Sequence, residues 1–139
     1  MSEINIDELS ARSIRILCAE TVQAPNSGHP GAPLGLAAVA HTLFSEFLRF
    51  DPTDPSWINR DHFILSNGHA SSLLYVMLHL SGYGITLDEL KTFRSLNSRL
   101  AGHPESFHVP GVEVTTGPLG NGISSAVGMA IAQKHLASK

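Results

Sequence analysis

Apolar residues recur at helical spacing along most of this chain, and the pattern predicts five helices. The first helix begins after Asn5, which has capping-box spacing with Glu8, and it ends before Pro25. The second helix follows Pro33 and carries the most regular apolar stripe of the chain. That stripe consists of Leu36, Val39, Ala40, Leu43, Phe44, Phe47 and Leu48. Its spacing is typical of an amphipathic helix.

Three further helices follow. Residues 70–80 are apolar nearly all round, which indicates a helix that is buried on most sides. A second capping box, Thr86 with Glu89, predicts a fourth helix, and the last helix runs from about Ile123 to Ala137. Small residues in the last helix permit close packing against a neighbour; they are Ala126, Gly128, Ala130 and Ala132.

Predicted strands are few. The short apolar run at residues 63–65 lies between polar segments and directly precedes a helix, which predicts a buried strand of a parallel sheet. Residues 112–116 are a weaker second candidate. Two strands do not make a sheet that five helices can cover on both faces. Because no linker or repeat marks a second domain, we expect residues 1–139 to form a single partial domain, the helix-rich first part of a larger α/β fold.

The composition narrows the class of protein. A hydrophobic fraction of 42% permits a buried core, and the net charge of −3, with Lys and Arg scattered, argues against nucleic-acid and membrane partners. Cys18 is the sole cysteine, so no intrachain disulfide forms, as is typical of a reducing compartment. The first seven residues lack the pattern of a secretory signal, and no apolar run reaches the ~18 residues of a membrane span. We therefore expect a cytoplasmic protein.

Histidine recurs on glycine-rich turns. His29, His69 and His103 lie in the segments Ser-Gly-His-Pro-Gly, Ser-Asn-Gly-His-Ala and Ala-Gly-His-Pro-Glu. Glycine lets the backbone approach a ligand closely, and histidine titrates near neutral pH. The repetition predicts loops that converge on a polar ligand whose charge changes during a reaction.

Each histidine also has a simpler interpretation. His69, at the start of a helix, is placed to contact a phosphate, but a turn histidine can equally face solvent. The rigid Gly-His-Pro turns of His29 and His103 fix the imidazoles, or they are plain connections between helices. A metal site is disfavoured, because neither His103 with His108 nor His62 with His69 has a recognised ligand spacing.

A fourth turn, residues 116–122, contains three glycines and no ionisable group. The spacing of Gly117, Gly120 and Gly122 fits no standard phosphate loop. Such a backbone can instead present N–H and C=O groups to a flat heterocycle. Pro118 and Leu119 favour that interpretation, since Leu119 offers an apolar surface on which a ring can rest.

Several of these segments, in order, resemble the amino-terminal part of the transketolase family. They are SGHPGAPLG at 27–35, WINRD at 57–61, LSNGHA at 65–70, GHPE at 102–105 and VEVTTGPLG at 112–120. The resemblance covers nearly the whole chain. It implies a thiamine diphosphate binding fold, with three α/β/α layers around a parallel sheet, and a homodimer with active sites between the subunits.

The resemblance also implies roles for single residues. His69 corresponds to the histidine on the cofactor diphosphate, and residues 117–119 correspond to the loop that holds the aminopyrimidine through main-chain groups. His29 and His103 correspond to the catalytic, substrate-binding pair near the sugar C1 hydroxyl and the reacting carbons. The family transfers a two-carbon ketol unit from a ketose phosphate to an aldose phosphate in the pentose phosphate pathway. Such a reaction needs groups that accept and return protons near neutral pH, which suits histidine.

The family's divalent metal, Mg²⁺ or Ca²⁺, is held by a Gly-Asp-Gly motif and a later Asn, and no Gly-Asp-Gly occurs here. We therefore expect the metal ligands to lie outside this chain and residues 1–139 alone to be an inactive fragment. Two alternatives remain open. One is an enzyme similar to dihydroxyacetone synthase, which passes the same unit to formaldehyde. The other is a shortened, non-catalytic paralogue that acts as an interaction module.

Overall fold

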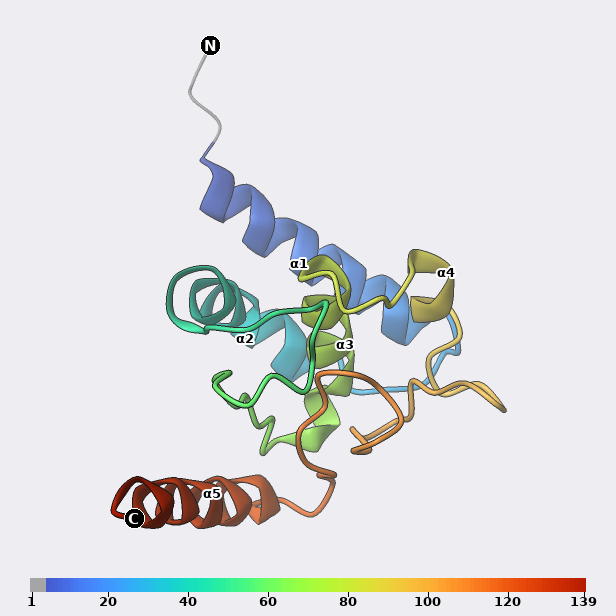
Figure 1. Ribbon diagram of the computed structural model, residues 1–139. Coiled ribbons are helices and arrows are strands. Elements are labelled where there is room, and N and C mark those ends of the chain that lie inside the picture. The colour runs from blue at the N-terminus through green and yellow to red at the C-terminus, as the bar shows by residue number, and fades with distance from the viewer. Residues whose placement is uncertain (1–4) are drawn as a thin grey trace.

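The computed structural model describes residues 5–139, which form helices joined by long irregular segments. The helices are α1 (Ile6–Gln23), α2 (Gly31–Thr42), α3 (Ser71–Leu80), α4 (Leu87–Leu90) and α5 (Asn121–Ala137). A π-helical turn, Leu43–Phe47, prolongs α2, and a 3-10 turn, Gly68–Ala70, leads into α3. In Figure 1, α1 and α2 lie against α3, while α5 extends away from them. No described helix is both long and apolar enough to span a membrane.

Helix α3 is the centre of the hydrophobic core. Every residue from Ser71 to Leu78 is buried, which confirms the prediction from its all-round apolar sequence. Helix α1 adds Ile14 and Cys18 to this core, and α2 adds Ala37. The core therefore fixes the start of α3, where the Gly68–Ala70 turn carries His69.

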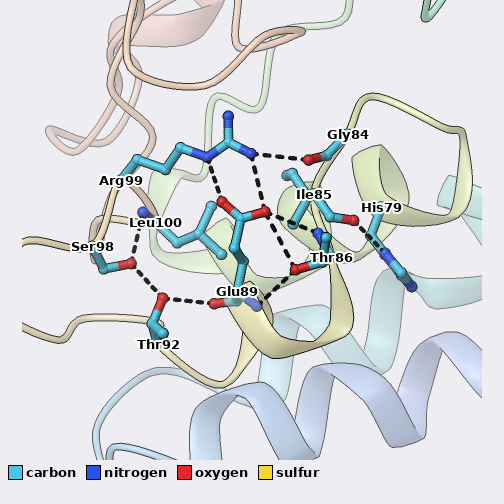
Figure 2. A network of polar contacts seen from close by, with 9 residues as sticks. All are labelled: His79, Gly84, Ile85, Thr86, Glu89, Thr92, Ser98, Arg99 and Leu100. Atoms are coloured by element: carbon cyan, nitrogen blue, oxygen red, sulfur yellow. Dashed lines mark hydrogen bonds and ion pairs between the residues drawn. The ribbon is translucent and has the colours of Figure 1, made fainter.

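Both helix caps predicted from the sequence, at Asn5 and at Thr86, form in the structure. The Asn5 side chain accepts a hydrogen bond from the Glu8 backbone N–H at 3.1 Å, and Thr86 and Glu89 form a reciprocal capping box. The Glu89 carboxylate also accepts two hydrogen bonds from Arg99, at 2.8 and 3.2 Å (Figure 2). This ion pair attaches α4 to the loop that leads to His103.

The apolar stripe of α2 defines its buried face only in part. Of the stripe, Ala40 is buried and Phe44 packs against the core, but Leu36, Val39 and Phe47 are exposed. Ala37, outside the stripe, is fully buried. The physical reason is that α2 packs closely on α1 and α3, and a methyl side chain permits this approach better than a branched one.

The two predicted strands do not form within residues 5–139. Residues 63–65 and 112–116 are irregular, although Leu65 and Val112 are buried. A parallel strand is completed by backbone hydrogen bonds to a neighbouring strand, and the described segments supply no such neighbour. The described structure is thus helical, and the parallel sheet expected from the sequence is not part of it.

Helix α5 begins two residues earlier than expected and ends as predicted at Ala137. Three of its four small residues are exposed in the described chain, namely Gly128, Ala130 and Ala132, and Gly128 has nothing within 4 Å of its would-be Cβ. Only Gly122, near the helix start, is buried. The first turn of α5 is therefore its attachment to the rest of the described chain.

Candidate active site

The structure brings the three turn histidines into contact. His29 lies between α1 and α2, His69 in the 3-10 turn before α3, and His103 in the loop after α4. The ring centroids of His29 and His69 are 4.8 Å apart, and those of His69 and His103 are 4.7 Å apart. Both pairs meet edge to face, with His69 in the middle. The predicted convergence of these loops is thus observed.

Glycine makes this convergence possible at two positions. Gly28 has φ of +145°, and a Cβ there would lie 3.1 Å from Val22 and 3.2 Å from Phe93. At Gly68, a Cβ would lie 2.8 Å from the backbone of Thr116. The His29 and His69 turns can therefore sit this close to their neighbours only because a side chain is missing beside each imidazole.

The fourth turn borders the histidine cluster through its first residues. A Cβ on Gly117 would lie 3.6 Å from Cγ of His103, and the Thr116 N–H donates to the Pro104 carbonyl at 3.1 Å. Pro118 and Leu119 are exposed, and Leu119 keeps 74% of its surface open to solvent. An apolar side chain beside a polar cluster offers a ligand two kinds of contact at once.

The histidine cluster and the adjoining fourth turn contain buried polar atoms without hydrogen-bond partners. His69 Nδ1, His103 Nε2 and Thr116 Oγ1 are buried and have no hydrogen-bond partner among the described residues. Buried polar atoms in folded proteins are nearly always hydrogen-bonded, so each needs a partner. Three such atoms on adjoining turns fit a polar ligand with several hydrogen-bonding groups.

The surroundings of His103 favour its neutral form. Burial is the main cause that lowers its pKa below the ordinary value of 6.5. Positive charge on His69, Arg94 and His29 lowers this pKa further, in that order. Because the folded pKa lies below the unfolded one, the stability that depends on neutral His103 is retained above about pH 6.5 and is lost as the pH falls through the folded pKa. Near neutral pH, His103 is thus ready to accept a proton.

Sequence reasoning missed Arg94. The loop after α4 brings its guanidinium to the cluster, where Nη2 lies 3.4 Å from His29 Nδ1. The local sequence, Phe-Arg-Ser-Leu-Asn, matches no motif and has no periodicity. No signal near Arg94 in the sequence marks it, because its place depends on how the loop folds.

The other histidines lie outside the cluster. His62 pairs with Glu113 at 3.0 Å and His108 with Glu105 at 3.6 Å. Within residues 5–139 no group of three His, Cys, Asp or Glu side chains is placed to hold a metal ion. A cavity of about 500 Å³ opens elsewhere, between α1, the π-helical turn and α3.

Comparison with known proteins agrees with this arrangement. The sequence matches the family described as transketolase, thiamine diphosphate binding domain, over residues 6–139. It is 63% identical over 134 residues to transketolase 1 of Saccharomyces cerevisiae, covering 96% of this chain and 19% of that protein. It is 58% identical over 129 residues to transketolase 2 of Escherichia coli, covering 93% and 19%. The chain spans about a fifth of the length of these relatives.

Solved structures give the same result. A transketolase of Pichia stipitis in complex with sedoheptulose-7-phosphate aligns with a TM-score of 0.93 at 56% identity, over 96% of this chain and 20% of the other. A transketolase from Leishmania mexicana aligns with a TM-score of 0.92 at 53% identity, over 94% and 20%. The helices and turns described above are therefore those of this fold. The chain belongs to the transketolase family, in which it matches the thiamine diphosphate binding domain.

Proposed function

We propose that this chain is part of an enzyme that transfers a two-carbon ketol unit from a ketose phosphate to an aldose phosphate, with thiamine diphosphate as its cofactor. The observation that carries the proposal is the contact of His29, His69 and His103 on turns typical of the family. Related structures from Pichia stipitis contain sedoheptulose-7-phosphate, fructose-6-phosphate or xylulose-5-phosphate. All three are ketose phosphates, which supports this substrate class and a place in the pentose phosphate pathway.

The unpaired atoms of the site fit the cofactor. We assign the diphosphate contact to His69, whose buried Nδ1 has no partner in the described chain and whose turn opens α3. We assign the contact with the aminopyrimidine to main-chain groups of the loop formed by Gly117, Pro118 and Leu119. When bound, the cofactor supplies the electron sink for cleavage of the carbon–carbon bond. The chain's own residues supply position, hydrogen bonds and proton transfer.

We assign proton transfer at the substrate hydroxyls to His29 and His103. Two observations support this role for His103: burial lowers its pKa, and its Nε2 has no hydrogen-bond partner among the described residues. A neutral imidazole accepts a hydroxyl proton as the bond to the two-carbon unit breaks, and returns it when the unit joins the acceptor. His29 is more exposed, which suits a residue that meets an arriving sugar.

The remaining expectations from the sequence are part of the same proposal. We infer a homodimer, a cytoplasmic location and a bound Mg²⁺ or Ca²⁺ whose ligands belong to residues outside this chain. Residues 1–139 would be one portion of the cofactor-binding domain. Because a chloroplastic transketolase from spinach is 52% identical to this chain, location needs a direct measurement in cells.

Product analysis of the complete protein tests the function. Xylulose-5-phosphate and a five-carbon aldose phosphate should give sedoheptulose-7-phosphate and a three-carbon aldose phosphate by mass spectrometry, only with thiamine diphosphate and Mg²⁺ present. Transfer to formaldehyde alone would favour the dihydroxyacetone synthase alternative, and no transfer to either acceptor would favour the non-catalytic paralogue. The relatives named above are transketolases, so we expect the first result.

A further inference from the structure

Arg94 bridges two of the three histidine turns. Its Nη1 donates to the Ser27 hydroxyl at 3.0 Å, while Nη2 lies 3.4 Å from His29 Nδ1 and 3.5 Å from the Gly102 carbonyl, to which it donates. Ser27 and Gly102 directly precede the Gly28-His29 and His103 positions of their turns. One side chain thus contacts both Gly-His turns at once.

The Arg94 side chain packs between Gly102 and the ring of Phe93. A Cβ on Gly102 would lie 2.8 Å from Arg94 Nε, so the turn leaves room for the guanidinium. On the other side, Arg94 Cζ lies 5.5 Å from the centre of the buried Phe93 ring. Arg94 also has φ of +59°, an unfavourable conformation for a residue with a side chain, and its N–H donates to the Leu100 carbonyl at 3.0 Å.

Arg94 has no acidic partner among residues 5–139. Five of the arginines and lysines in the described chain form ion pairs, Arg99 with Glu89 among them, but Arg94 contacts only neutral or histidine groups. Its positive charge is therefore not cancelled locally. This charge is one of the causes that lower the pKa of His103.

We propose that Arg94 is a positioning residue, which fixes His29 and His103 relative to each other through the hydrogen bonds of its forked guanidinium. One planar guanidinium contacts three groups that lie in different directions, the Ser27 hydroxyl, His29 Nδ1 and the Gly102 carbonyl. A forked side chain with several N–H donors is needed for this. The charged or titratable groups that face His103 are Arg94, His69 and His29, and Arg94 is the permanently charged one. The geometry holds without the proposed function; only the effect on turnover rests on that function.

The test compares three variants in the complete protein. Arg94→Gln removes the charge and most of the fork, and Arg94→Lys keeps the charge without the fork. Arg99→Gln is the matched control, because Arg99 lies five residues away on the same loop, and its side chain donates to Glu89 and Gly84 instead of to the histidine turns (Figure 2). Thermal unfolding of each variant reports any general loss of stability.

Two readouts separate positioning from a structural role. Arg94→Gln should lower kcat about 10- to 100-fold, the order expected when reacting groups are misplaced by an ångström, with thiamine diphosphate affinity within about twofold of wild type. Histidine C–H deuterium exchange, followed by mass spectrometry across pH in cofactor-free protein, gives the pKa of His103 directly. That pKa should rise in Arg94→Gln and stay low in Arg94→Lys, while kcat of Arg94→Lys falls between wild type and Arg94→Gln.

The proposal is overturned if Arg94→Lys has the kcat of the wild type, or if Arg94→Gln and Arg99→Gln lower kcat and unfolding temperature equally. An unchanged pKa of His103 in Arg94→Gln would also overturn it. Should Arg94→Gln fail to fold, Arg94→Lys decides alone through kcat. If the wild-type protein transfers no two-carbon unit, the proposed function fails, and the exchange measurement still decides whether Arg94 controls His103.

Discussion

His69 touches both other imidazoles of the cluster, whereas His29 and His103 have no direct ring contact with each other. It is also part of the turn that begins the buried helix α3, so its position is the most firmly fixed of the three. A central, rigid histidine is suited to hold a bound group. The outer two are better suited to exchange protons with a group that arrives and leaves.

From this difference between the central and outer histidines, we predict that His69→Ala in the complete protein mainly weakens the binding of thiamine diphosphate. Loss of one hydrogen bond to a charged group is worth about 1.5–3 kcal/mol, which corresponds to roughly 10- to 100-fold in apparent affinity. Turnover should largely recover at high cofactor concentration. The measurement is a cofactor titration of the rate, with the exposed His108→Ala as control. Unchanged affinity with collapsed turnover would instead assign chemistry to His69.

For His29→Ala and His103→Ala, we expect the opposite result. Each should leave cofactor affinity nearly intact and lower the transfer rate by roughly 10²- to 10⁴-fold, as for a positioned acid–base group. Since both would act on neighbouring oxygens, the double variant should be less impaired than the product of the two singles. Rates of all four proteins at saturating cofactor give the coupling. A wild-type rate in either single variant would show that its turn is only scaffold.

Part of the site could be predicted from the sequence, because glycine and histidine carry their chemistry with them. A histidine that follows a glycine in a turn is conspicuous in the sequence, and the three such turns, two Gly-His-Pro and one Gly-His-Ala, predicted one site. Arg94 is different. Its role comes from a backbone with φ of +59° and from contacts 65 to 67 residues away, to His29 and Ser27, neither of which leaves a local pattern.

At the scale of elements, the start of α5 is locked to the His69 turn. A Cβ on Gly122 would lie 2.4 Å from Ser66 Cα, and the Ile123 N–H donates to the Ser66 hydroxyl at 3.1 Å. Gly120, with φ of +91°, turns the chain into this contact. Helix α5 thereby connects the fourth turn to the loop that carries His69.

We predict that Gly122→Ala lowers the unfolding free energy by about 1–3 kcal/mol, because the extra methyl group must displace the backbone of residue 66. Thiamine diphosphate affinity should fall too, since His69 shifts with its turn. Gly128→Ala on the same helix is the matched control, with nothing within 4 Å of its Cβ, and should leave stability unchanged or higher. Denaturant unfolding of both variants checks this. Equal changes in the two variants would contradict the prediction, because only Gly122 has the close contact with Ser66.

Elements were predictable wherever their determinants are local. The caps at Asn5 and Thr86 and the apolar run of α3 lie within the helices they define. The predicted apolar face of α2 was wrong for Leu36, Val39 and Phe47, because close neighbours in space select which residues of this helix are buried. The strands at 63–65 and 112–116 were wrong for these residues, because a strand exists only with a partner across the ladder.

At the scale of the whole molecule, two apolar surfaces of the described chain are uncovered. On α2 and the π-helical turn, Leu36, Val39 and Phe47 are exposed. On α5, Ile123, Val127 and Ile131 are more than half exposed along a helix that extends away from the other helices (Figure 1). Apolar areas of this extent in water favour association with other surfaces.

We therefore predict that a polypeptide of residues 1–139, prepared by itself, folds partially or aggregates. Calorimetry should detect no binding of thiamine diphosphate with Mg²⁺, because no described group of His, Cys, Asp or Glu side chains can hold the metal beside the diphosphate. The complete protein, measured under the same conditions, is the positive control. Saturable binding by a monodisperse preparation of this polypeptide would contradict the prediction.

The apolar surface of α5 can be tested as the cause of this aggregation. Ile131→Glu replaces a side chain that is 66% exposed with a charged one, and should raise the monomeric fraction in size-exclusion chromatography. Gln133→Glu adds the same charge to the exposed end of the helix without removing an apolar group, so it isolates the effect of charge. If both variants raise the monomeric fraction equally, net charge controls association. If only Ile131→Glu does so, the uncovered face of α5 is the surface through which the isolated chain associates.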